Sequence, residues 1–555
     1  MSVQATFSAT LVDEWLALGV TDAVVCPGSR STPLALALAA RLRVHVKLDE
    51  RSGAFFALGL ALASGRPAVV CVTSGTAAAE LHAAVVEAHH AKVPLIVCTA
   101  DRPPELHGIG APQTIEQVGL FRAATRWDAD PGVPDQADAA TWRTLAARAY
   151  AEAVDGPAGP GPVHLNLAFR EPLTGEPGPL PHRLERAASP SAPVADVALT
   201  EPLRGRGVLV VGRPAGGRPL DPAPVLALAA GLRWPVFADP LSGCRVPGTV
   251  AAADAIVRTA PPGPECVVLV GAPWLSRPLA DYLVQAAAAG ARVVAVDPWG
   301  DAPDPHRIVT ESHRAGIQAW LAAAAASGVP CDPAWLTSWE AREARAQAAI
   351  TRVLGDSLNE PQVARAVFRA AGTAGATVLT SASMPIRDLE WYAAPVPSPP
   401  RVVANRGANG IDGVVSTALG FAAGGAGTPT LCLLGDLSFL HDVSGLVNLP
   451  PVPCTFVVVD NGGGGIFSFL PQAGTVEPDR FEALFGTPPT SDVASVARGF
   501  GLPVEEVTTF RAFEDALAVA ETATEPSVLH VRVPDRAQNV ALHAALHEAV
   551  AQALA

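Results

Sequence analysis

The sequence contains almost no lysine. Lys47 and Lys92 are the only lysines among its 39 basic residues, so a lysine Schiff base has almost no candidates. Carbonyl chemistry in this chain would therefore need another electron sink. Positive charge is also in short supply, because 53 acidic residues outnumber the basic ones and give a net charge of −14. That balance opposes sequence-independent attraction to nucleic acid or to an anionic lipid surface.

Long hydrophobic runs and paired cysteines are missing as well. Charge, Gly or Pro interrupts each apolar stretch before it reaches the roughly 18 to 20 residues of a membrane helix. Asp13 and Glu14 interrupt the N-terminus where a signal peptide would carry its apolar stretch. We therefore expect a cytoplasmic protein without a membrane span. The eight cysteines form no Cys-x-x-Cys pair and lie mostly in apolar runs, which predicts buried thiols.

The remaining composition is that of a large globular protein. A chain of 555 residues is too long for one hydrophobic core, and its 49% hydrophobic residues can fill several. Short apolar runs ending in Gly, Pro, Ser or Asp alternate with Ala- and Leu-rich helical stretches. This alternation is typical of buried parallel strands joined by helices. It predicts an α/β protein with three doubly wound parallel-sheet domains.

The predicted strands fall into three sets. A Pro- and Gly-rich stretch at 172–193 follows the first set, and a helical stretch at 335–353 ends the second. The first set comprises 23–26, 44–48, 68–72, 94–99 and 163–167; the second comprises 208–211, 235–238, 266–270 and 293–296; the third comprises 377–380, 402–404, 430–434, 456–459 and 528–531. Ligands of such sheets bind at the carboxyl ends of the strands, next to helix N-termini.

Polar residues and glycines follow two predicted strands of the third set. One strand runs into Gly435, Asp436, Leu437 and Ser438, and the next runs into the segment 460–465, Asp-Asn-Gly-Gly-Gly-Gly. Asp and Asn supply the oxygen ligands that Mg²⁺ prefers, and glycine lets the backbone approach a phosphate closely. An isolated Gly-Asp would more often be a helix cap. The paired segments favour a metal-phosphate site.

These two segments resemble the metal-diphosphate signature of thiamine diphosphate enzymes, Gly-Asp-Gly followed by Asn-Asn. Leu437 replaces the last Gly and Asp460 the first Asn. Both departures fit one subfamily, the 2-succinyl-5-enolpyruvyl-6-hydroxy-3-cyclohexene-1-carboxylate synthases of menaquinone biosynthesis. The resemblance is thin from about 174 to 353. Further segments similar to this subfamily lie at 26–34, 49–51, 100–106, 112–114 and 405–413.

The resemblance implies the three-domain architecture of pyruvate oxidase- and decarboxylase-like enzymes. The expected domains are a pyrimidine-binding domain at 1–178, a central Rossmann-like domain at 179–354 and a diphosphate-binding domain at 355–555. The implied cofactors are thiamine diphosphate and Mg²⁺, with Mn²⁺ as an alternative metal. Pyrimidine and diphosphate sites of this fold family meet across a subunit interface, which implies a homodimer or a homotetramer.

The implied activity is that of an acyl transferase. It would decarboxylate 2-oxoglutarate and add the remaining four-carbon succinyl unit to isochorismate by conjugate addition. The proton donor that completes the addition is not assigned. The implied partners are these two small molecules, with no nucleic acid and no membrane span.

The resemblance also assigns cofactor residues. Glu50 is expected to be catalytic, because a carboxyl group at the aminopyrimidine ring favours the imino tautomer, whose nitrogen removes the thiazolium proton. Asp436, the Asn461 side chain and the Gly463 carbonyl would hold the metal ion. Other expected cofactor contacts are Gly410, Ile411, Gly435, Leu437, Ser438 and Ile466.

Substrate contacts are expected from arginines and polar residues that follow predicted strands. A planar guanidinium meets a carboxylate with two parallel hydrogen bonds, and an unpaired buried carboxylate is costly. A pocket with several arginines therefore suits two dicarboxylate substrates. By resemblance, the expected substrate residues are Ser29, Arg30, Arg102, Gln113, Arg277, Ser383, Arg387, Arg406, Phe467 and Leu470.

Three alternatives remain at this point. The nearest is another thiamine diphosphate-dependent 2-keto acid decarboxylase or an acetolactate synthase-like enzyme. A noncatalytic subunit that keeps the fold is disfavoured because Glu50 and Asp436 are both present. A dinucleotide-dependent dehydrogenase lacks a convincing Gly-x-Gly-x-x-Gly segment in its first βα unit. We expect structural or surface roles for His82, His89, His90, His107 and His441.

Overall fold

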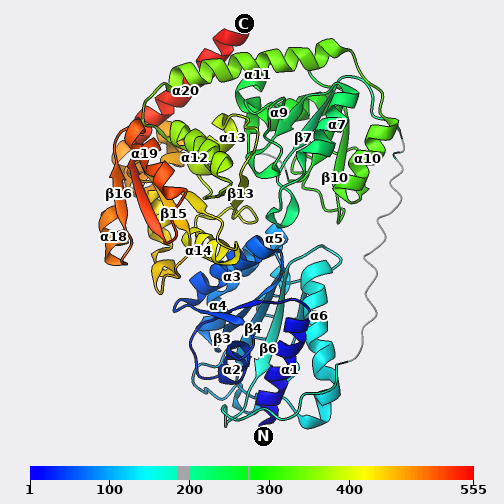
Figure 1. The fold of residues 1–555 in the computed structure, drawn as a ribbon, viewed down its shortest axis with the longest axis vertical. Coiled ribbons are helices and arrows are strands. Elements are labelled where there is room, and N and C mark those ends of the chain that lie inside the picture. The colour runs from blue at the N-terminus through cyan, green and yellow to red at the C-terminus, as the bar shows by residue number, and fades with distance from the viewer. Residues whose placement is uncertain (184–198, 200, 273–274) are drawn as a thin grey trace. The chain divides into compact units, whose positions relative to one another are not determined.

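The computed structural model describes residues 1–183, 199, 201–272 and 275–555 (Figure 1). The chain forms two units, each with its own internal contacts. Unit 1 comprises Met1–Ser191, Asn405–Gly427 and His441–Val452, and unit 2 comprises Ala192–Ala404, Thr428–Leu440 and Pro453–Ala555. Unit 1 therefore combines the N-terminal third of the chain with two short segments from the C-terminal third.

Unit 1 is built on a six-stranded parallel sheet with the strand order β2-β1-β3-β4-β6-β5. The central strands are buried on both faces, as expected for apolar runs such as Ala-Val-Val-Cys-Val. The strands are β1 (Asp22–Val25), β2 (Arg43–Val46), β3 (Ala68–Val72), β4 (Leu95–Asp101), β5 (Trp127–Ala129) and β6 (Pro162–Ala168).

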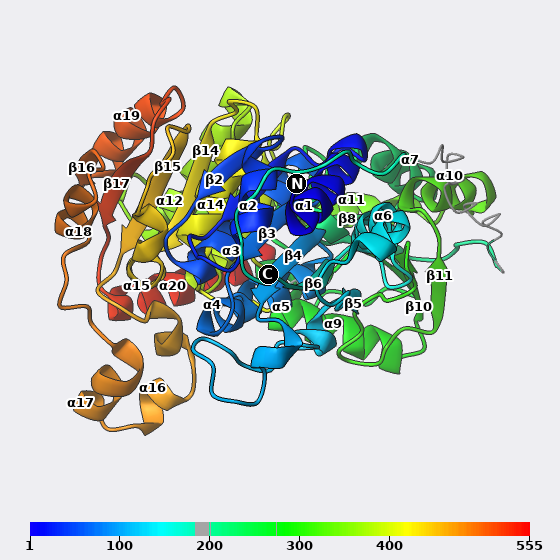
Figure 2. The same ribbon diagram turned by 90° about the horizontal axis from the view of Figure 1, so that it is seen from below.

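Helices cover this sheet. On one face α1 (Val3–Ala17), α2 (Thr32–Ala39) and α6 (Trp142–Asp155) share a core with the strands, and Figure 2 shows them beside one another. The other N-terminal helical segments are α3 (Glu50–Ser64), α4 (Thr76–Glu80), α5 (His82–Ala91), η1 (Pro104–Leu106), η2 (Arg122–Ala124) and η3 (Gln136–Thr141).

Two segments from the C-terminal third complete unit 1. Helix α14 (Val414–Gly424) packs against α3, because glycines let the two backbones approach closely. A Cβ atom on Gly59 would lie 2.1 Å from the carbonyl oxygen of Thr417. A Cβ atom on Gly420 would likewise lie 2.0 Å from the carbonyl oxygen of Phe56. The second segment carries η6 (Val443–Leu446).

Unit 2 contains a five-stranded parallel sheet with the order β11-β10-β9-β7-β8. Its core includes several tryptophans and extends to the C-terminal helix α20 (Arg536–Leu554), which packs along α11 (Pro333–Leu354). The strands are β7 (Gly207–Val211), β8 (Val236–Ala238), β9 (Cys266–Val270), β10 (Arg292–Asp297) and β11 (Glu311–Arg314). The remaining helical segments are η4 (Ala215–Gly217), α7 (Pro222–Leu232), η5 (Pro240–Ser242), α8 (Ala253–Val257), α9 (Arg277–Ala288) and α10 (Ile317–Ser327).

A second, six-stranded parallel sheet in unit 2 has the order β13-β12-β14-β15-β17-β16. Its strands are β12 (Thr377–Thr380), β13 (Arg401–Ala404), β14 (Thr430–Gly435), β15 (Cys454–Asp460), β16 (Val504–Val507) and β17 (Ser527–Arg532). Strands β14 and β15 pair with Gly435 opposite Val459, so their carboxyl ends lie side by side. The helical segments are α12 (Glu360–Ala374), α13 (Met384–Tyr392), α15 (Asp436–His441), η7 (Gly465–Phe469), α16 (Gln472–Thr475), α17 (Pro478–Phe481), η8 (Glu482–Gly486), α18 (Val493–Gly499) and α19 (Phe510–Ala520).

The predicted α/β class with three parallel sheets is confirmed, and so is the helix at 335–353. The predicted strands each lie at a strand of the structure, with ends shifted by up to two residues. Sequence reasoning missed β5, β11 and β16, which are edge strands without an apolar run. Of the stretch at 172–193, residues 172–183 carry no helix or strand, and the rest lies outside the described residues.

The cysteines are free, and all but the half-buried Cys331 are buried, as the composition predicts. Across the described part of the chain, each helix is too short or too polar to cross a membrane.

Candidate active site

Two carboxyl-terminal strand ends in unit 2 bring Asp436 and Asn461 to the same edge of the sheet. Asp436 begins α15 directly after β14, and Asn461 follows β15. Asp436 is 2% exposed; its Oδ1 accepts a hydrogen bond from the Leu437 N–H at 2.7 Å. Its Oδ2 atom and the Asn461 Oδ1 atom are buried without a hydrogen-bond partner. Such atoms normally cost about 1–3 kcal/mol each, so a cation bound to both oxygens would remove a real penalty.

Asp460 lies beside Asp436 but has a different environment. Its Oδ2 lies 2.7 Å from the Nε2 atom of His530, a fully buried side chain on β17. This hydrogen bond lowers the pKa of Asp460. Burial, and then the negative charge of Asp460, raise the pKa of Asp436. A divalent cation would favour the ionised form of Asp436.

The glycine run provides backbone close to these side chains. Gly462 and Gly463 have φ angles of 75° and 131°, which favour glycine. A Cβ atom on Gly463 would lie 2.2 Å from the Gly486 carbonyl oxygen. The Gly463 carbonyl accepts a bond from the Gly465 N–H at 2.9 Å and has a second lone pair available. The strand ends thus fit a metal ion and a phosphate group.

This donor set is poor in charged side chains. In the described residues, no group of three or more His, Cys, Asp or Glu side chains is arranged to hold a metal ion. The predicted set includes one such side chain, Asp436, together with an amide and a carbonyl oxygen. Mg²⁺ is commonly held in this way, with phosphate oxygens and water completing its coordination.

The predicted cofactor residues outside unit 2 belong to unit 1. Glu50 is the first residue of α3 and is half-buried, and Asp49 caps the helix by accepting a bond from the Ser52 N–H at 2.9 Å. Gly410 and Ile411 precede α14 and are also half-buried. A Cβ atom on Gly413 would lie 2.0 Å from the Phe55 ring, so the start of α14 packs against the first turns of α3. The structure thus brings Glu50 and the 410–411 segment into the same part of unit 1.

Arg102 and Gln113 meet at Ser74 in unit 1. The Arg102 Nη1 group donates a hydrogen bond to the Ser74 hydroxyl. That hydroxyl donates to the Gln113 carbonyl at 2.9 Å, and the Gln113 side chain donates to the Ser74 carbonyl at 3.1 Å. The predicted substrate residues of the 100–114 region are therefore connected.

Arg30 adds a second guanidinium to this region. Its side chain is 10% exposed; Nη1 donates to the Phe169 carbonyl at 3.0 Å, and Nη2 lies 3.3 Å from Glu171. Burial, followed by the positive charge of Arg30, lowers the pKa of Arg102. Two guanidinium groups that repel each other favour a bound anion between them.

Sequence reasoning missed a network of buried polar side chains that is hydrogen-bonded to the backbone of Arg102. Gln117 is fully buried; its Oε1 accepts from the Gly75 N–H at 2.8 Å, and its Nε2 donates to Asn166 Oδ1 at 3.0 Å. Asn166 in turn donates to Asp101 Oδ2 at 2.9 Å, and Asp101 Oδ1 accepts from the Arg102 N–H at 2.7 Å. The available signal was a set of polar residues within or next to buried strands, Asn166 above all.

The remaining predicted substrate residues are more scattered. Arg387 donates to the Ser383 carbonyl at 2.6 Å at the start of α13. Arg277 begins α9 with 91% of its side chain exposed and lies 3.8 Å from Asp281. Phe467 packs on Phe485 with ring centroids 5.7 Å apart. Ser29 and Leu470 are exposed, and Arg406 is half-buried. Ile466, an expected cofactor contact, is half-buried as well.

His107, for which we expected a structural or surface role, lies next to Arg102. His107 Nε2 lies 3.0 Å from the Arg102 carbonyl oxygen and 3.6 Å from Asp101. His82 packs on Phe121, and His89 contacts Arg126.

Comparison with known proteins gives matches along most of the chain. Residues 5–120 match "Thiamine pyrophosphate enzyme, N-terminal TPP binding domain", residues 183–376 match "Middle domain of thiamine pyrophosphate", and residues 390–531 match "Thiamine pyrophosphate enzyme, C-terminal TPP binding domain".

Curated relatives match the chain at full length. A protein of Thermobifida fusca is 44% identical over 589 residues, covering 100% of both chains. A protein of Chloroflexus aurantiacus is 42% identical over 588 residues, covering 99% of this chain and 96% of its own. A protein of Geobacillus kaustophilus is 39% identical over 588 residues, covering 99% and 98%. All three carry the name 2-succinyl-5-enolpyruvyl-6-hydroxy-3-cyclohexene-1-carboxylate synthase.

Proposed function

The chain belongs to the thiamine pyrophosphate enzymes and, among them, to the 2-succinyl-5-enolpyruvyl-6-hydroxy-3-cyclohexene-1-carboxylate synthases, and we propose that the residues assembled above carry that activity. It is a thiamine diphosphate-dependent transferase of menaquinone biosynthesis. We propose that it decarboxylates 2-oxoglutarate and transfers the remaining succinyl unit to isochorismate.

Unit 2 would hold the metal and diphosphate end of the cofactor. Asp436, Asn461 and the Gly463 carbonyl would bind Mg²⁺, with Mn²⁺ as the alternative. Gly435, Leu437, Ser438 and Ile466 would contact the cofactor beside them. Support comes from two unpaired buried oxygens at adjoining strand ends and from the glycine backbone next to them. Thiamine diphosphate, when bound, supplies the electron sink that the scarcity of lysine makes necessary.

Glu50 would hold a proton at the pyrimidine end of the cofactor. Glu50 lies in the first turn of α3, whose backbone is held by the Asp49 cap and by the packing of α3 on α14. Gly410 and Ile411, which precede α14, would orient the same end of the cofactor. Proton transfer by a positioned carboxyl group typically contributes 100-fold or more to a rate, roughly.

Arginines would bind the substrate carboxylates. Arg30 and Arg102 offer two guanidinium groups in one region, and Gln113 is connected to Arg102 through Ser74. A bound carboxylate would relieve the repulsion between the two arginines. We assign further substrate contacts, by resemblance, to Ser29, Arg277, Ser383, Arg387, Arg406, Phe467 and Leu470.

Several finer statements belong to the same proposal. The domain boundaries at 1–178, 179–354 and 355–555 are predictions from the sequence. A homodimer or homotetramer would allow a pyrimidine site and a diphosphate site to meet between subunits. Cytoplasmic location is likewise a prediction.

The observation that supports this function most strongly is the sequence identity of 44% and 42% to two of the synthases over nearly the full length of the chain. It disfavours the alternative of an acetolactate synthase-like enzyme. The test is to incubate the purified protein with thiamine diphosphate, Mg²⁺, 2-oxoglutarate and isochorismate. Product is expected only when all four are present. Turnover of pyruvate to acetolactate, without use of isochorismate, would overturn the assignment.

Two variants separate the proposed roles. Glu50→Gln is expected to lower kcat by about 100-fold or more, while the affinity of the protein for thiamine diphosphate is mostly retained. Asp436→Ala is expected to abolish Mg²⁺-dependent binding of thiamine diphosphate, measured by calorimetric titration. Tight Mg²⁺-dependent binding by Asp436→Ala would contradict the metal assignment.

A further inference from the structure

Glu360 connects the start of helix α12 to the end of strand β15 within unit 2. It is the first residue of α12, and Asn359 caps that helix by accepting a bond from the Gln362 N–H at 2.9 Å. Glu360 is only 5% exposed. Its Oε1 atom accepts a hydrogen bond from the Asn461 Nδ2 group at 2.8 Å. A buried carboxyl group therefore contacts the side chain of a proposed metal ligand.

This hydrogen bond decides which way the Asn461 amide points. A carboxamide has a donating end and an accepting end, and only the oxygen can bind a cation. Glu360 takes the NH₂ end, so Oδ1 is presented away from it, where it is buried without a protein partner. Gly465 packs closely on the NH₂ end, since a Cβ atom there would lie 2.5 Å from Nδ2.

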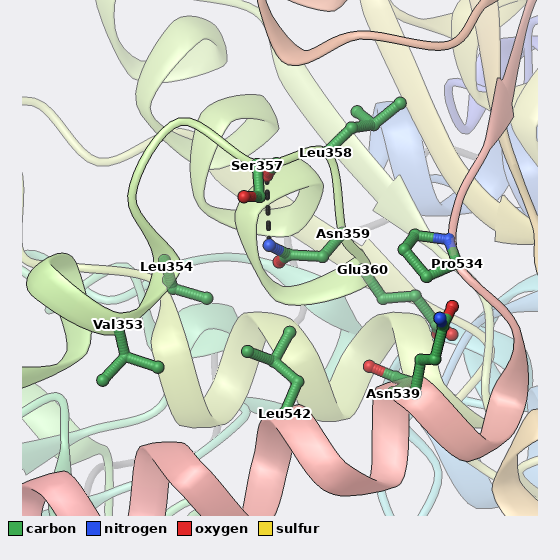
Figure 3. Close-up of a pocket in the computed structure, with 10 residues that line it drawn as sticks. Val353, Leu354, Ser357, Leu358, Asn359, Glu360, Pro534, Asn539 and Leu542 are labelled. Atoms are coloured by element: carbon green, nitrogen blue, oxygen red, sulfur yellow. Dashed lines mark hydrogen bonds between the residues drawn. The ribbon is translucent and has the colours of Figure 1, made fainter.

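The cavity next to Glu360 offers its carboxyl group no basic side chain, so the hydrogen bond from Asn461 is an important contact. Glu360 lines a cavity of about 270 Å³ formed by the α11–α12 connection and α20 (Figure 3). The residues that line the cavity, among them Leu358, Asn539 and Leu542, include no basic side chain. No cation from the cavity wall competes for the carboxyl group.

The orienting bond does not depend on the charge of Glu360. Burial, and then the nearby Asp388, raise the pKa of Glu360 to about 8. A neutral carboxylic acid still has a carbonyl oxygen that accepts a hydrogen bond, as a carboxylate does. The Asn461 amide is therefore held in the same orientation in either protonation state.

We propose that Glu360 is a positioning residue that fixes the Asn461 side chain with its oxygen toward the metal ion. The proposal rests on the proposed function for the identity of the metal ligands. Replacing the hydrogen-bond partner of a metal ligand typically lowers the affinity for the metal by about 10- to 100-fold. Glu360 does not need to touch the metal or the cofactor to have this effect.

The test compares Glu360→Leu with Glu360→Gln in the full-length protein. Affinity for thiamine diphosphate is titrated at increasing Mg²⁺ and at increasing Mn²⁺. Glu360→Leu removes the acceptor and is expected to weaken metal-dependent binding by about 10- to 100-fold. Glu360→Gln keeps a carbonyl oxygen and is expected to stay within about threefold of the unmodified protein. Equal loss in both variants, or in neither, would overturn the proposal.

Glu343→Leu is the matched control. Glu343 is another buried glutamate of unit 2, on α11, and it accepts a bond from the Ala252 N–H at 3.0 Å. Its replacement removes a buried carboxyl group away from the proposed metal ligands. Metal-dependent binding is expected to be unchanged in Glu343→Leu. A loss as large as that of Glu360→Leu would show a general effect of buried glutamates and overturn the positioning role.

A second background distinguishes orientation from stability. In Asn461→Asp both ends of the side chain are oxygens, so its orientation no longer matters. Adding Glu360→Leu to Asn461→Asp is therefore expected to cost less than about threefold in metal-dependent affinity, instead of 10- to 100-fold. An undiminished cost in this background would refute the proposal. Glu360→Met, which keeps the side-chain length, replaces Glu360→Leu if the latter does not fold.

These experiments separate the two levels of assignment. If Asp436→Ala loses metal-dependent binding while Glu360→Leu retains it, the proposed function stands and the positioning role fails. If Asp436→Ala also retains binding, the metal assignment itself fails.

Discussion

Asp436 and Asp460 follow neighbouring strands, yet the protein treats the two carboxyl groups differently. Asp460 is paired with His530, and this partner lowers its pKa. Asp436 is almost fully buried, keeps one oxygen without a partner, and has a raised pKa. Asp460 thus has a side-chain partner within the protein, whereas one oxygen of Asp436 is left for a ligand. This difference depends on His530, which lies 70 residues beyond Asp460.

His164 gives a pH-dependent prediction at the same scale. It is 1% exposed on β6, its Nε2 lies 2.7 Å from the Thr99 hydroxyl, and burial lowers its pKa from 6.5 to about 4. The unfolded chain therefore binds a proton between pH 6.5 and about 4 that the folded chain does not bind. The contribution of His164 to the free energy of unfolding is fully present above pH 6.5 and is lost as the pH falls toward 4. Between pH 7 and pH 5, the free energy of unfolding is expected to fall by about 2 kcal/mol because of this one group.

The check is urea unfolding of the unmodified protein and of His164→Gln at pH 7 and at pH 5. His164→Gln is expected to lose about 2 kcal/mol less over this interval, because it has no imidazole to protonate. The exposed His90 provides the control, since His90→Gln should keep the full pH dependence. Equal losses in His164→Gln and the unmodified protein would contradict the prediction.

At the scale of elements, apolar patterning and close helix packing have different causes. Central strands such as β3 are recognisable from their continuous apolar residues. Edge strands such as β16, with the sequence Val-Glu-Glu-Val, follow no apolar pattern, because one side faces water. The packing of α3 on α14 could not be predicted either. Gly59 and Gly420 matter because of the backbone that lies opposite each of them.

Gly59→Ala tests this packing. Its new methyl group would meet the Thr417 carbonyl oxygen, so we expect a loss of at least about 1 kcal/mol of stability. Gly231→Ala is the matched control, because Gly231 lies in helix α7 with nothing within 4 Å of the added atom. That change is expected to stabilise by about 0.5–1 kcal/mol, the usual gain of Ala over Gly in a helix. Denaturant unfolding measures both, and two changes of the same sign would refute the argument.

At the scale of the whole molecule, unit 1 depends on residues from the N-terminal and the C-terminal thirds of the chain. The Glu87 carboxylate accepts bonds from the Gly407 N–H at 2.7 Å and the Ala408 N–H at 2.6 Å. Asp442 accepts a bond from the Ser416 N–H at 2.7 Å and another from the Ser52 hydroxyl at 3.3 Å. Without the C-terminal segments, one face of α3 and these buried polar groups would lose their partners.

A fragment of residues 1–183 is therefore expected to fold poorly by itself. It should lack a cooperative unfolding transition and should be cleaved rapidly in limited proteolysis, because the α14-facing side of α3 would be exposed. The same fragment joined by flexible linkers to residues 405–427 and 441–452 is the control and should regain protection. A fragment of residues 1–183 that unfolds cooperatively without this addition would contradict the assignment of these segments to unit 1.

The sequence by itself determined the features that depend on local spacing. Alternating apolar runs specified buried parallel strands, and the residues at the ends of two such runs placed Asp436 and Asn461 at one edge of a sheet. The scarcity of lysine pointed to a cofactor as the electron sink. Only the tertiary structure decided that Glu360 binds Asn461 across 101 residues and that Gln117 joins the support of Arg102. The physical reason is that a buried polar group must find a partner, but its choice depends on which distant elements the fold brings within hydrogen-bond distance.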